Sequence, residues 1–301
     1  MKYSTEEVVT KLDLPLKKYA SGKVREIYDL SDRLLMVTTD RISAFDYVLP
    51  SAIPYKGKVL TGLSAYWFGL MGGIVDNHLV TADIAKFPEE LQKYREILSG
   101  RSMIVLKAKR IDVECVVRGY ISGSAWKEYK QSGTVCGVKM PSGMEESERF
   151  SEPVFTPSTK SDTGHDENIS IEKMKDLVGK DLTCELEETS IKVYEKAARK
   201  AKSGRIIIAD TKFEYGQVDG KTMLIDELLT PDSSRFWDLR DYSPGRSQTS
   251  FDKQFVRDYL EGIKWNKAPP APVLPDDIAE KTADRYLEAY NRITGSSFPG
   301  L

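Results

Sequence analysis

Residues 205–227 read RIIIADTKFEYGQVDGKTMLIDE and decide the fold of the second half of the chain. The isoleucines at 206–208 are β-branched and follow one another without a polar break, as is typical of a buried strand. Asp219-Gly220 is a strong signal for a hairpin turn. The stretch therefore predicts a buried strand that turns back on itself as a β-hairpin.

Three charged side chains of this hairpin are candidates for chemistry. Lys212 and Glu214 share one face, because side chains alternate along a strand. A three-residue turn would place Glu214 opposite Asp226, whereas a two-residue turn would shift the register and separate the two carboxylates. Opposed carboxylates repel unless a cation lies between them, and Mg²⁺ on one or two carboxylates suits phosphoryl transfer. The alternative is a solvated hairpin with ordinary surface charges, and the apolar flanking residues argue against it.

Working outward from the hairpin, the sequence predicts an α+β protein with two lobes. The N-terminal part reads as mostly antiparallel sheet, and the second half mixes helices with strands. We place the boundary at residue 112, which gives lobes over 1–112 and 113–301. Strands are expected over 23–30, 34–39, 103–109 and 113–120, helices over 61–71, 181–204, 250–264 and 279–294, and loop-rich chain over 132–168.

The composition excludes several classes of protein. The 301 residues carry a formal net charge of −2, so there is no global electrostatic case for nucleic acid or an anionic membrane. The most apolar segment, Ser64–Val75, is shorter than the ~20 residues that a membrane-spanning helix needs. Three cysteines lie far apart and predict reduced thiols in a cytoplasmic protein, not a disulfide framework or zinc site. The sequence leaves the oligomeric state open.

Two segments have the character of anion sites. Residues 114–124, ECVVRGYISGS, predict a strand that enters a Gly/Ser turn at a helix start, where free amides, Arg118 and Ser124 could bind an anion. A capped helix with Arg118 in a salt bridge is the alternative. In the segment Gly22–Arg25, a glycine before a strand lets backbone amides approach a phosphate. A turn glycine followed by solvated basic residues explains that segment equally well.

The loop over 156–168, TPSTKSDTGHDEN, is dense in short polar side chains. Such a segment cannot build a core, so it is either ligand-facing or disordered. Arg235 and Arg257 offer guanidinium groups that could bind phosphate or carboxylate in two-pronged fashion. Taken singly, each of these arginines is more often part of a surface ion pair.

Taken together, six segments resemble the phosphoribosylaminoimidazole-succinocarboxamide synthase (SAICAR synthetase) family in its stand-alone form. The resemblance runs from about Tyr19 to Tyr259. It implies an N-terminal nucleotide-binding lobe similar to that of protein kinases, followed by a lobe that binds substrate and metal. The segments, in order, are GKVREIYD, DRISAFD, ECVVRGYISGSAWKEY, EPVFTPSTKSD-TGHDENIS, ADTKFEYG and IDELLTPDSSRFW.

The resemblance also implies roles for single residues. It places ATP at Gly22, Lys23 and Arg25, with Lys107 nearby. It implies catalytic roles for Lys212, Glu214 and Asp226, with Mg²⁺ on the two carboxylates. The resemblance does not assign the residues that bind aspartate, and our own expectation is the turn at Gly119–Ser124. The residues expected to hold carboxyaminoimidazole ribotide are Arg118, Ser124, Lys160, Asp166, Arg235 and Arg257.

The implied reaction is the ATP-dependent ligation of L-aspartate to the ribotide carboxylate, which yields SAICAR, ADP and phosphate in purine synthesis. A carboxylate has a poor leaving group, so we expect activation as an acyl phosphate. A kinase is the rival enzyme class, but the chain has neither an H-R-D-x-x-x-x-N nor a D-F-G motif. A non-catalytic nucleotide-binding protein is the third possibility, and the intact Lys212, Glu214 and Asp226 argue against it.

Overall fold

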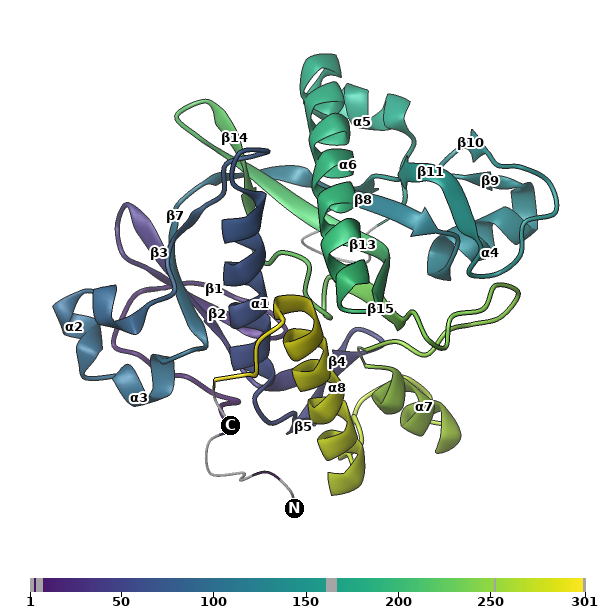
Figure 1. Ribbon diagram of the computed structural model, residues 1–301. Helices are drawn as coiled ribbons and strands as arrows, with labels where there is room; N and C mark the ends of the chain where they lie inside the picture. Colours follow the sequence, from purple (N-terminus) through teal and green to yellow (C-terminus); the bar gives the residue numbers. More distant parts are fainter. Residues whose placement is uncertain (1–2, 4–7, 161–166, 252, 300–301) are drawn as a thin grey trace. The chain divides into compact units, whose positions relative to one another are not determined.

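The computed structural model describes residues 3, 8–160, 167–251 and 253–299, and it consists of two compact units (Figure 1). The first unit contains residues 1–66, 78–107 and 251–301, and the second contains 67–77 and 108–250. The predicted division at residue 112 therefore needs two corrections. It falls inside one continuous strand, β8 (Lys109–Tyr120), and the C-terminal helices belong to the first unit. Local patterns do not show that a chain returns to an earlier unit.

In the first unit, an antiparallel sheet packs against short helices. Its strand order is β1 (Lys18–Ser21), β2 (Arg25–Asp29), β3 (Arg33–Thr38), β7 (Ser102–Leu106) and β6 (Leu79–Thr81). The hairpin predicted over 23–39 is β2–β3 and is confirmed. Tyr28, Leu35 and Ile104 from the sheet share a core with Phe87 and Leu91. The other elements are β4 (Arg41–Ala44), β5 (Tyr47–Ala52), the start of α1 (Lys56–Met71), the 3-10 helix η1 (Ile84–Lys86), α2 (Glu89–Gln92), α3 (Arg95–Leu98), α7 (Gln254–Gly262) and α8 (Asp276–Thr294).

The second unit is built on a sheet with the order β11–β8–β13–β14, in which β12 also pairs with β8 and β15 with β13. The long helix α6 (Lys180–Ser203) packs on β8 and β13, and Gly204 caps its C-terminus, as predicted. The predicted α+β class with antiparallel pairing is confirmed. The bounds are β11 (Arg149–Phe155), β12 (Ser158–Thr159), β13 (Ile206–Val218), β14 (Lys221–Ile225), β15 (Ser234–Asp238), α4 (Gly123–Ser132), α5 (Ile171–Val178), β9 (Thr134–Val135) and β10 (Val138–Lys139).

The two faces of the β8–β13 ladder have opposite characters. Glu114 lies opposite Glu214 and Arg118 lies opposite Asp210, so charged side chains share one face. The alternate residues of both strands are buried and apolar or uncharged, for example Cys115 and Phe213. This second face meets α6, where the Ser190 and Tyr215 hydroxyls lie 3.0 Å apart. Because side chains alternate, one strand pair both anchors the helix and presents the charges.

The structure decides the alternative that the sequence left open for the hairpin, and it corrects the expectation for residues 132–168. The hairpin of β13 and β14 has a two-residue turn, since Val218 pairs with Lys221, and Glu214 therefore lies opposite Ile225. The strands predicted over 103–109 and 113–120 are β7 and β8, and they belong to different sheets. The segment 132–168 is more regular than expected, with β9 to β12 in its described part. No helix of the described residues is both long and apolar enough to cross a membrane.

The three cysteines should differ sharply in reactivity. Cys184 is exposed on α6, whereas Cys115 and Cys136 are buried. Burial raises the pKa of the Cys136 thiol to about 11 and also raises that of Cys115. The thiolate is the reactive form, so at pH 8 about one Cys136 thiol in a thousand is ionised. We expect a colorimetric disulfide reagent to titrate one fast thiol in the native protein and three in guanidinium. Cys184→Ser should remove the fast phase, and a second fast thiol in the native protein would contradict the assignment.

Candidate active site

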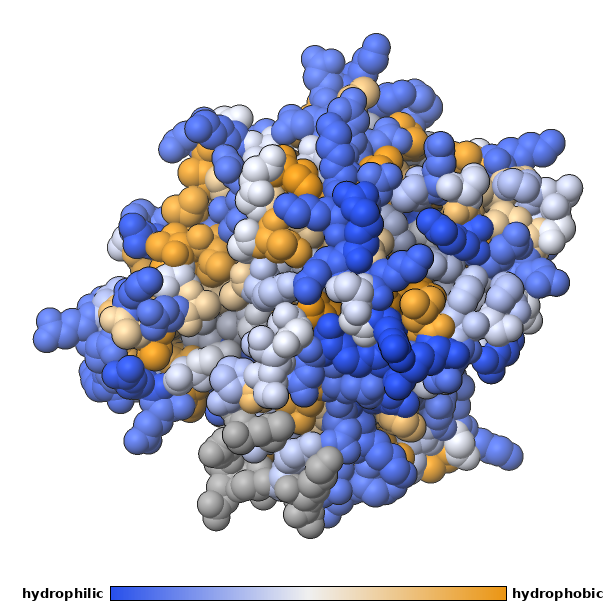
Figure 2. All heavy atoms as spheres, in the orientation of Figure 1, coloured by the Kyte–Doolittle hydropathy of each residue, from blue (hydrophilic) through white to orange (hydrophobic). Residues whose placement is uncertain are grey.

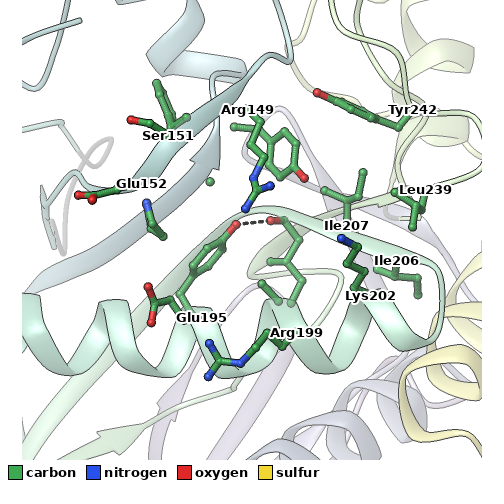
Figure 3. A pocket seen from close by; sticks show the side chains of 17 residues that line it. Arg149, Ser151, Glu152, Glu195, Arg199, Lys202, Ile206, Ile207, Leu239 and Tyr242 are labelled. Carbon is green, nitrogen blue, oxygen red and sulfur yellow. Dashed lines mark hydrogen bonds between the residues drawn. The ribbon is translucent and has the colours of Figure 1, made fainter.

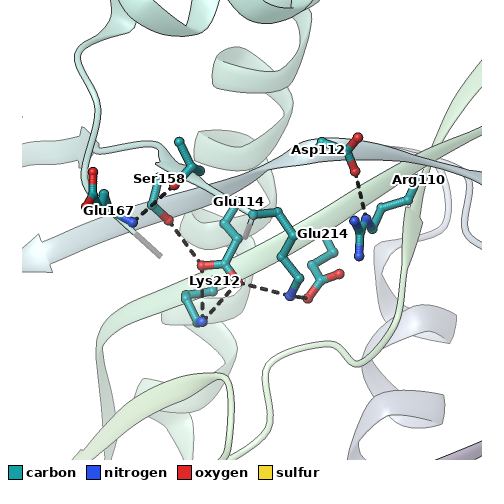
Figure 4. A network of polar contacts seen from close by, with 9 residues as sticks. Arg110, Asp112, Glu114, Ser158, Glu167, Lys212 and Glu214 are labelled. Atoms are coloured by element: carbon teal, nitrogen blue, oxygen red, sulfur yellow. Dashed lines mark hydrogen bonds and ion pairs between the residues drawn. The ribbon is translucent and has the colours of Figure 1, made fainter. Parts of the chain in front are cut away.

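A cluster of carboxylates and lysines lies on the charged face of the second unit's sheet (Figure 4). Glu114 on β8 is its centre and is only 1% exposed. Both of its carboxylate oxygens accept from the Lys212 ammonium at 3.1 Å, and Oε2 also accepts from the Ser158 hydroxyl at 3.1 Å. Lys160 bridges the two strands, since its ammonium lies 3.2 Å from Glu114 and 2.6 Å from Glu214. We call Glu114, Ser158, Lys160, Lys212 and Glu214 the carboxylate–lysine cluster.

The Lys160 ammonium resolves an electrostatic conflict within this cluster. Glu114 and Glu214 are directly opposed on adjacent strands, an arrangement that is destabilising for like charges. Burial disfavours the charged form of Lys160, but the Glu214 carboxylate and then Glu114 and Asp226 outweigh it and raise the lysine pKa. Lys160 therefore stays protonated between the carboxylates. The site already favours a positive charge at this point.

Asp226 lies near this cluster although it is not the cross-strand partner of Glu214. The two-residue turn does separate its register position from Glu214, as the alternative turn predicted. However, Asp226 directly follows β14 and has a left-handed backbone with φ of 65°. It lies close enough to Lys160 to help raise the pKa of that lysine. The predicted pair of carboxylates is thus brought near one cation without being paired across the hairpin.

A second cluster joins three strands of the same sheet around Asp210. One oxygen of Asp210 accepts from Arg118 on β8 at 2.7 Å and from Arg235 on β15 at 3.1 Å. Arg118 and Arg235 are the register partners of Asp210 on its two sides. We call these three residues the arginine cluster. Two guanidinium groups share one carboxylate, so the cluster carries a net positive charge and can bind an anion.

The start of α4 completes the surroundings of the arginine cluster. Arg118 donates to the Ser124 hydroxyl at 3.2 Å, and Arg235 donates to the Ser122 hydroxyl at 2.6 Å. Gly123 lies between these serines with φ of +58°, and a Cβ there would come within 2.6 Å of the Arg235 guanidinium. Burial lowers the pKa of Arg118, and the Asp210 charge opposes that effect. Arg118 thus lies beside Ser124 at a helix start, as expected for the anion site, and it also forms the salt bridge that the alternative named.

The first unit holds the four residues predicted to bind ATP. The Gly22 amide donates to the Arg25 carbonyl at 2.8 Å, so Gly22 and Arg25 close the turn between β1 and β2. The Lys23 ammonium lies 2.5 Å from Asp46. Lys107 pairs at 3.0 Å with Asp29, which ends β2, so it lies at the opposite end of that strand from the turn. The structure therefore does not bring Lys107 to the Gly22–Arg25 turn.

Two predicted substrate residues stay untested by this geometry. Arg257 lies on α7 in the first unit. Asp166 lies outside the described residues. Their roles with the ribotide remain predictions.

The sequence reasoning did not assign Glu114 and Asp210, the two acids that organise the clusters. Both stand within segments that were singled out, and each is a charged residue at the edge of an apolar run. An acidic residue beside an apolar run is a signal for such a site, because a carboxylate that is buried requires charged or hydrogen-bonding partners. Their partners are far away in sequence, since Arg118 and Asp210 are 92 positions apart. The described residues contain no group of three or more His, Cys, Asp or Glu side chains arranged to hold a metal.

Comparisons with known proteins agree on one family. A model of the SAICAR synthetase family matches residues 18–272. The phosphoribosylaminoimidazole-succinocarboxamide synthase of Geotalea uraniireducens is 54% identical over 291 residues, which covers 96% of this chain and 98% of that protein. The synthase of Thermodesulfovibrio yellowstonii is 56% identical over 279 residues, with coverage of 93% and 96%.

Solved structures give the same result. The SAICAR synthase of Saccharomyces cerevisiae, in complex with SAICAR, has a TM-score of 0.90 at 46% identity and covers 97% of this chain and 99% of that one. A SAICAR synthetase in complex with ADP has a TM-score of 0.68 at 26% identity, with coverage of 93% and 98%.

Gly123 and Gly133 provide a matched test of the arginine cluster. Both have left-handed backbones at the two ends of α4, but a Cβ at Gly133 meets nothing within 4 Å. Gly133→Ala should lower the free energy of unfolding by ~1 kcal/mol, the cost of the backbone alone. Gly123→Ala should cost about 1–3 kcal/mol more, because it displaces Arg235 from Asp210. Urea denaturation measures both, and equal losses would contradict the packing of Arg235 on Gly123.

Proposed function

Because this chain belongs to the SAICAR synthetase family, we propose that the two clusters of its second unit divide the family's reaction between them. The chain is a ligase of purine biosynthesis that joins L-aspartate to the carboxylate of carboxyaminoimidazole ribotide with the use of ATP. The observation that supports the division is the sheet register. It places cations beside opposed carboxylates at one point and two arginines around Asp210 at another.

The carboxylate–lysine cluster is our candidate for the phosphoryl-transfer step. In that step an oxygen of the ribotide carboxylate forms a bond to the ATP γ-phosphorus, the bond to the ADP oxygen breaks, and an acyl phosphate results. The aspartate amine then attacks the acyl carbon and inorganic phosphate leaves. Such a transfer needs charge neutralisation and alignment more than a protein nucleophile. Lys212 and Lys160, held by Glu114, supply fixed positive charge for the transferring group.

The same cluster fits a divalent cation. Glu214 and Asp226 supply carboxylate oxygens, the ligands that Mg²⁺ prefers, and both act on the one ammonium of Lys160. Glu214 and Asp226 would hold Mg²⁺, with further oxygens from substrate phosphates. When bound, Mg²⁺ supplies neutralisation of the charge that develops on the phosphate oxygens.

The arginine cluster is our candidate for the anionic groups of the ribotide. Arg235 is partly exposed while Arg118 is buried, so Arg235 can turn a donor toward a ligand as Arg118 holds Asp210 in place. The adjoining turn at Gly119–Ser124 remains the proposed aspartate site. In the first unit, Lys23 and the Gly22–Arg25 turn remain proposed contacts of the ATP phosphates. Lys107 remains a proposed ATP contact away from that turn, and Arg257 remains a proposed contact of the ribotide.

The acyl phosphate can be tested with oxygen-18. With both carboxylate oxygens of the ribotide labelled, one labelled oxygen should appear in each phosphate released, because the activated carboxylate oxygen leaves with phosphorus. Mass spectrometry of the phosphate measures this transfer. Phosphate without label would rule out the intermediate. Release of ADP without aspartate, at the rate seen with aspartate, would instead favour a kinase.

The metal role of Asp226 can be tested against a neighbour in the same hairpin. Asp226→Asn should lower kcat by roughly 10³-fold or more, because it removes a charged ligand of Mg²⁺. Asp219→Asn lies in the β13–β14 turn and should leave kcat near that of the wild type. Steady-state assays over a range of Mg²⁺ concentrations measure both variants. A kcat of Asp226→Asn within tenfold of wild type at saturating Mg²⁺ would contradict the proposal.

A further inference from the structure

The second unit contains a cavity of about 520 Å³, whose lining shares only Gly119 and Tyr120 with the residues proposed above to bind substrates (Figure 3). It lies between the C-terminal part of α6 and the strands β8, β11 and β13. Its size falls in the usual range for small-molecule pockets. None of its lining residues belongs to the carboxylate–lysine cluster or the arginine cluster. Gly119 and Tyr120, the last two residues of β8, line the cavity directly after Arg118.

One wall of the cavity is aromatic and rigid. Tyr120 and Tyr242 line it, and both pack edge-on or stacked against Trp237, with ring centroids 5.4 and 6.0 Å away. Ile207 and Leu239 continue the wall with aliphatic carbon. These side chains would bury the flat apolar body of a ligand with little loss of side-chain freedom.

The other wall depends on a close approach of α6 to β8. The Tyr194 hydroxyl donates to the Ile208 carbonyl at 2.7 Å. A Cβ at Gly119 would lie 1.9 Å from that hydroxyl oxygen. Only glycine permits this approach, so close packing of α6 on β8 defines this wall of the cavity.

Three cations surround the cavity: Arg149, Arg199 and Lys202. Among the described residues, none of the three forms an ion pair. In Figure 3, Arg149 extends from β11 over the cavity and Lys202 extends from α6 beside Ile207. Burial raises the pKa of Tyr120 and Tyr242, and the nearby Arg149 charge opposes that rise. Glu152 and Glu195 also line the cavity, so three cations stand against two carboxylates.

We propose that this cavity is a second ligand site, which binds a small aryl anion with its ring on the Tyr120–Tyr242 wall and its charge between Arg149 and Lys202. An aromatic body matches the wall, and an anionic group matches cations that have no carboxylate partner. Glu152 and Glu195 disfavour a highly charged ligand and could accept from a donor at its far end. The lining shares no residue with the carboxylate–lysine cluster or the arginine cluster, so we expect the ligand to bind together with ATP and the ribotide.

The probe for this site is 8-anilinonaphthalene-1-sulfonate, an aryl anion whose fluorescence rises on burial. We expect saturable one-to-one binding to the intact protein that persists with saturating Mg²⁺-ATP and L-aspartate. Ala198→Trp should weaken binding at least tenfold, because the indole fills the cavity from α6. Inorganic phosphate, which lacks the ring, should not displace the probe.

A charge reversal provides the second arm if Ala198→Trp does not fold. Arg149→Glu with Lys202→Glu should also weaken binding at least tenfold, since both side chains are exposed. Lys192→Glu is the matched control, because Lys192 lies on α6 outside the cavity and pairs with Glu188 at the surface. Displacement by ATP or aspartate would place the probe at the active site and overturn the proposal. Absence of saturable binding, or wild-type affinity in both cavity variants, would overturn it as well.

Discussion

The register between β8 and β13 is the constraint on which the second unit depends. It sets Glu114 opposite Glu214, and four residues along it sets Arg118 opposite Asp210. The two glutamates repel each other and need a cation between them. Arg118 and Asp210 attract each other and neutralise each other's charge, so Arg235 gives the arginine cluster its net positive charge. A slip of either strand by one residue would turn the charged side chains of that strand to the α6 face. The position of both clusters is therefore a property of one ladder.

The apolar face of the same ladder explains why the register holds. Cys115, Phe213 and Tyr215 are fully buried beneath α6, and a shift would place charged groups there without partners. The charged face thus takes its precision from burial on the opposite side. Sites on strands that are packed in this way are better positioned than sites on loops. Gly119 and Tyr194 extend the same close packing to the end of α6, where the cavity begins.

The lysines and carboxylates of the carboxylate–lysine cluster together set the charge of the site. Lys160 lies between Glu114 and Glu214 and is held charged by them, so a positive charge is present before any substrate arrives. A divalent cation on Glu214 and Asp226 would compete with the Lys160 ammonium for the Glu214 carboxylate. Glu114, which is buried and also holds Lys212, would then keep both lysines near the transferring phosphate. The arrangement suits a reaction in which the charge on oxygen moves between groups while the protein stays fixed.

The sequence by itself determined the family, the α+β class and the long helix before β13. It also identified most of the charged residues of the candidate site. These features depend on local composition and on motifs in a set order. It also narrowed the hairpin to two registers. Only the tertiary structure decided between these registers. It also showed that Arg118 pairs with Asp210 and that Glu114 is the centre of the carboxylate–lysine cluster, since cross-strand partners are set by packing between distant segments. The same holds for the grouping of residues 251–301 with the first unit and for the cavity beside α6. Local patterns report which face of a strand is buried, but they carry no information about which strand lies beside it.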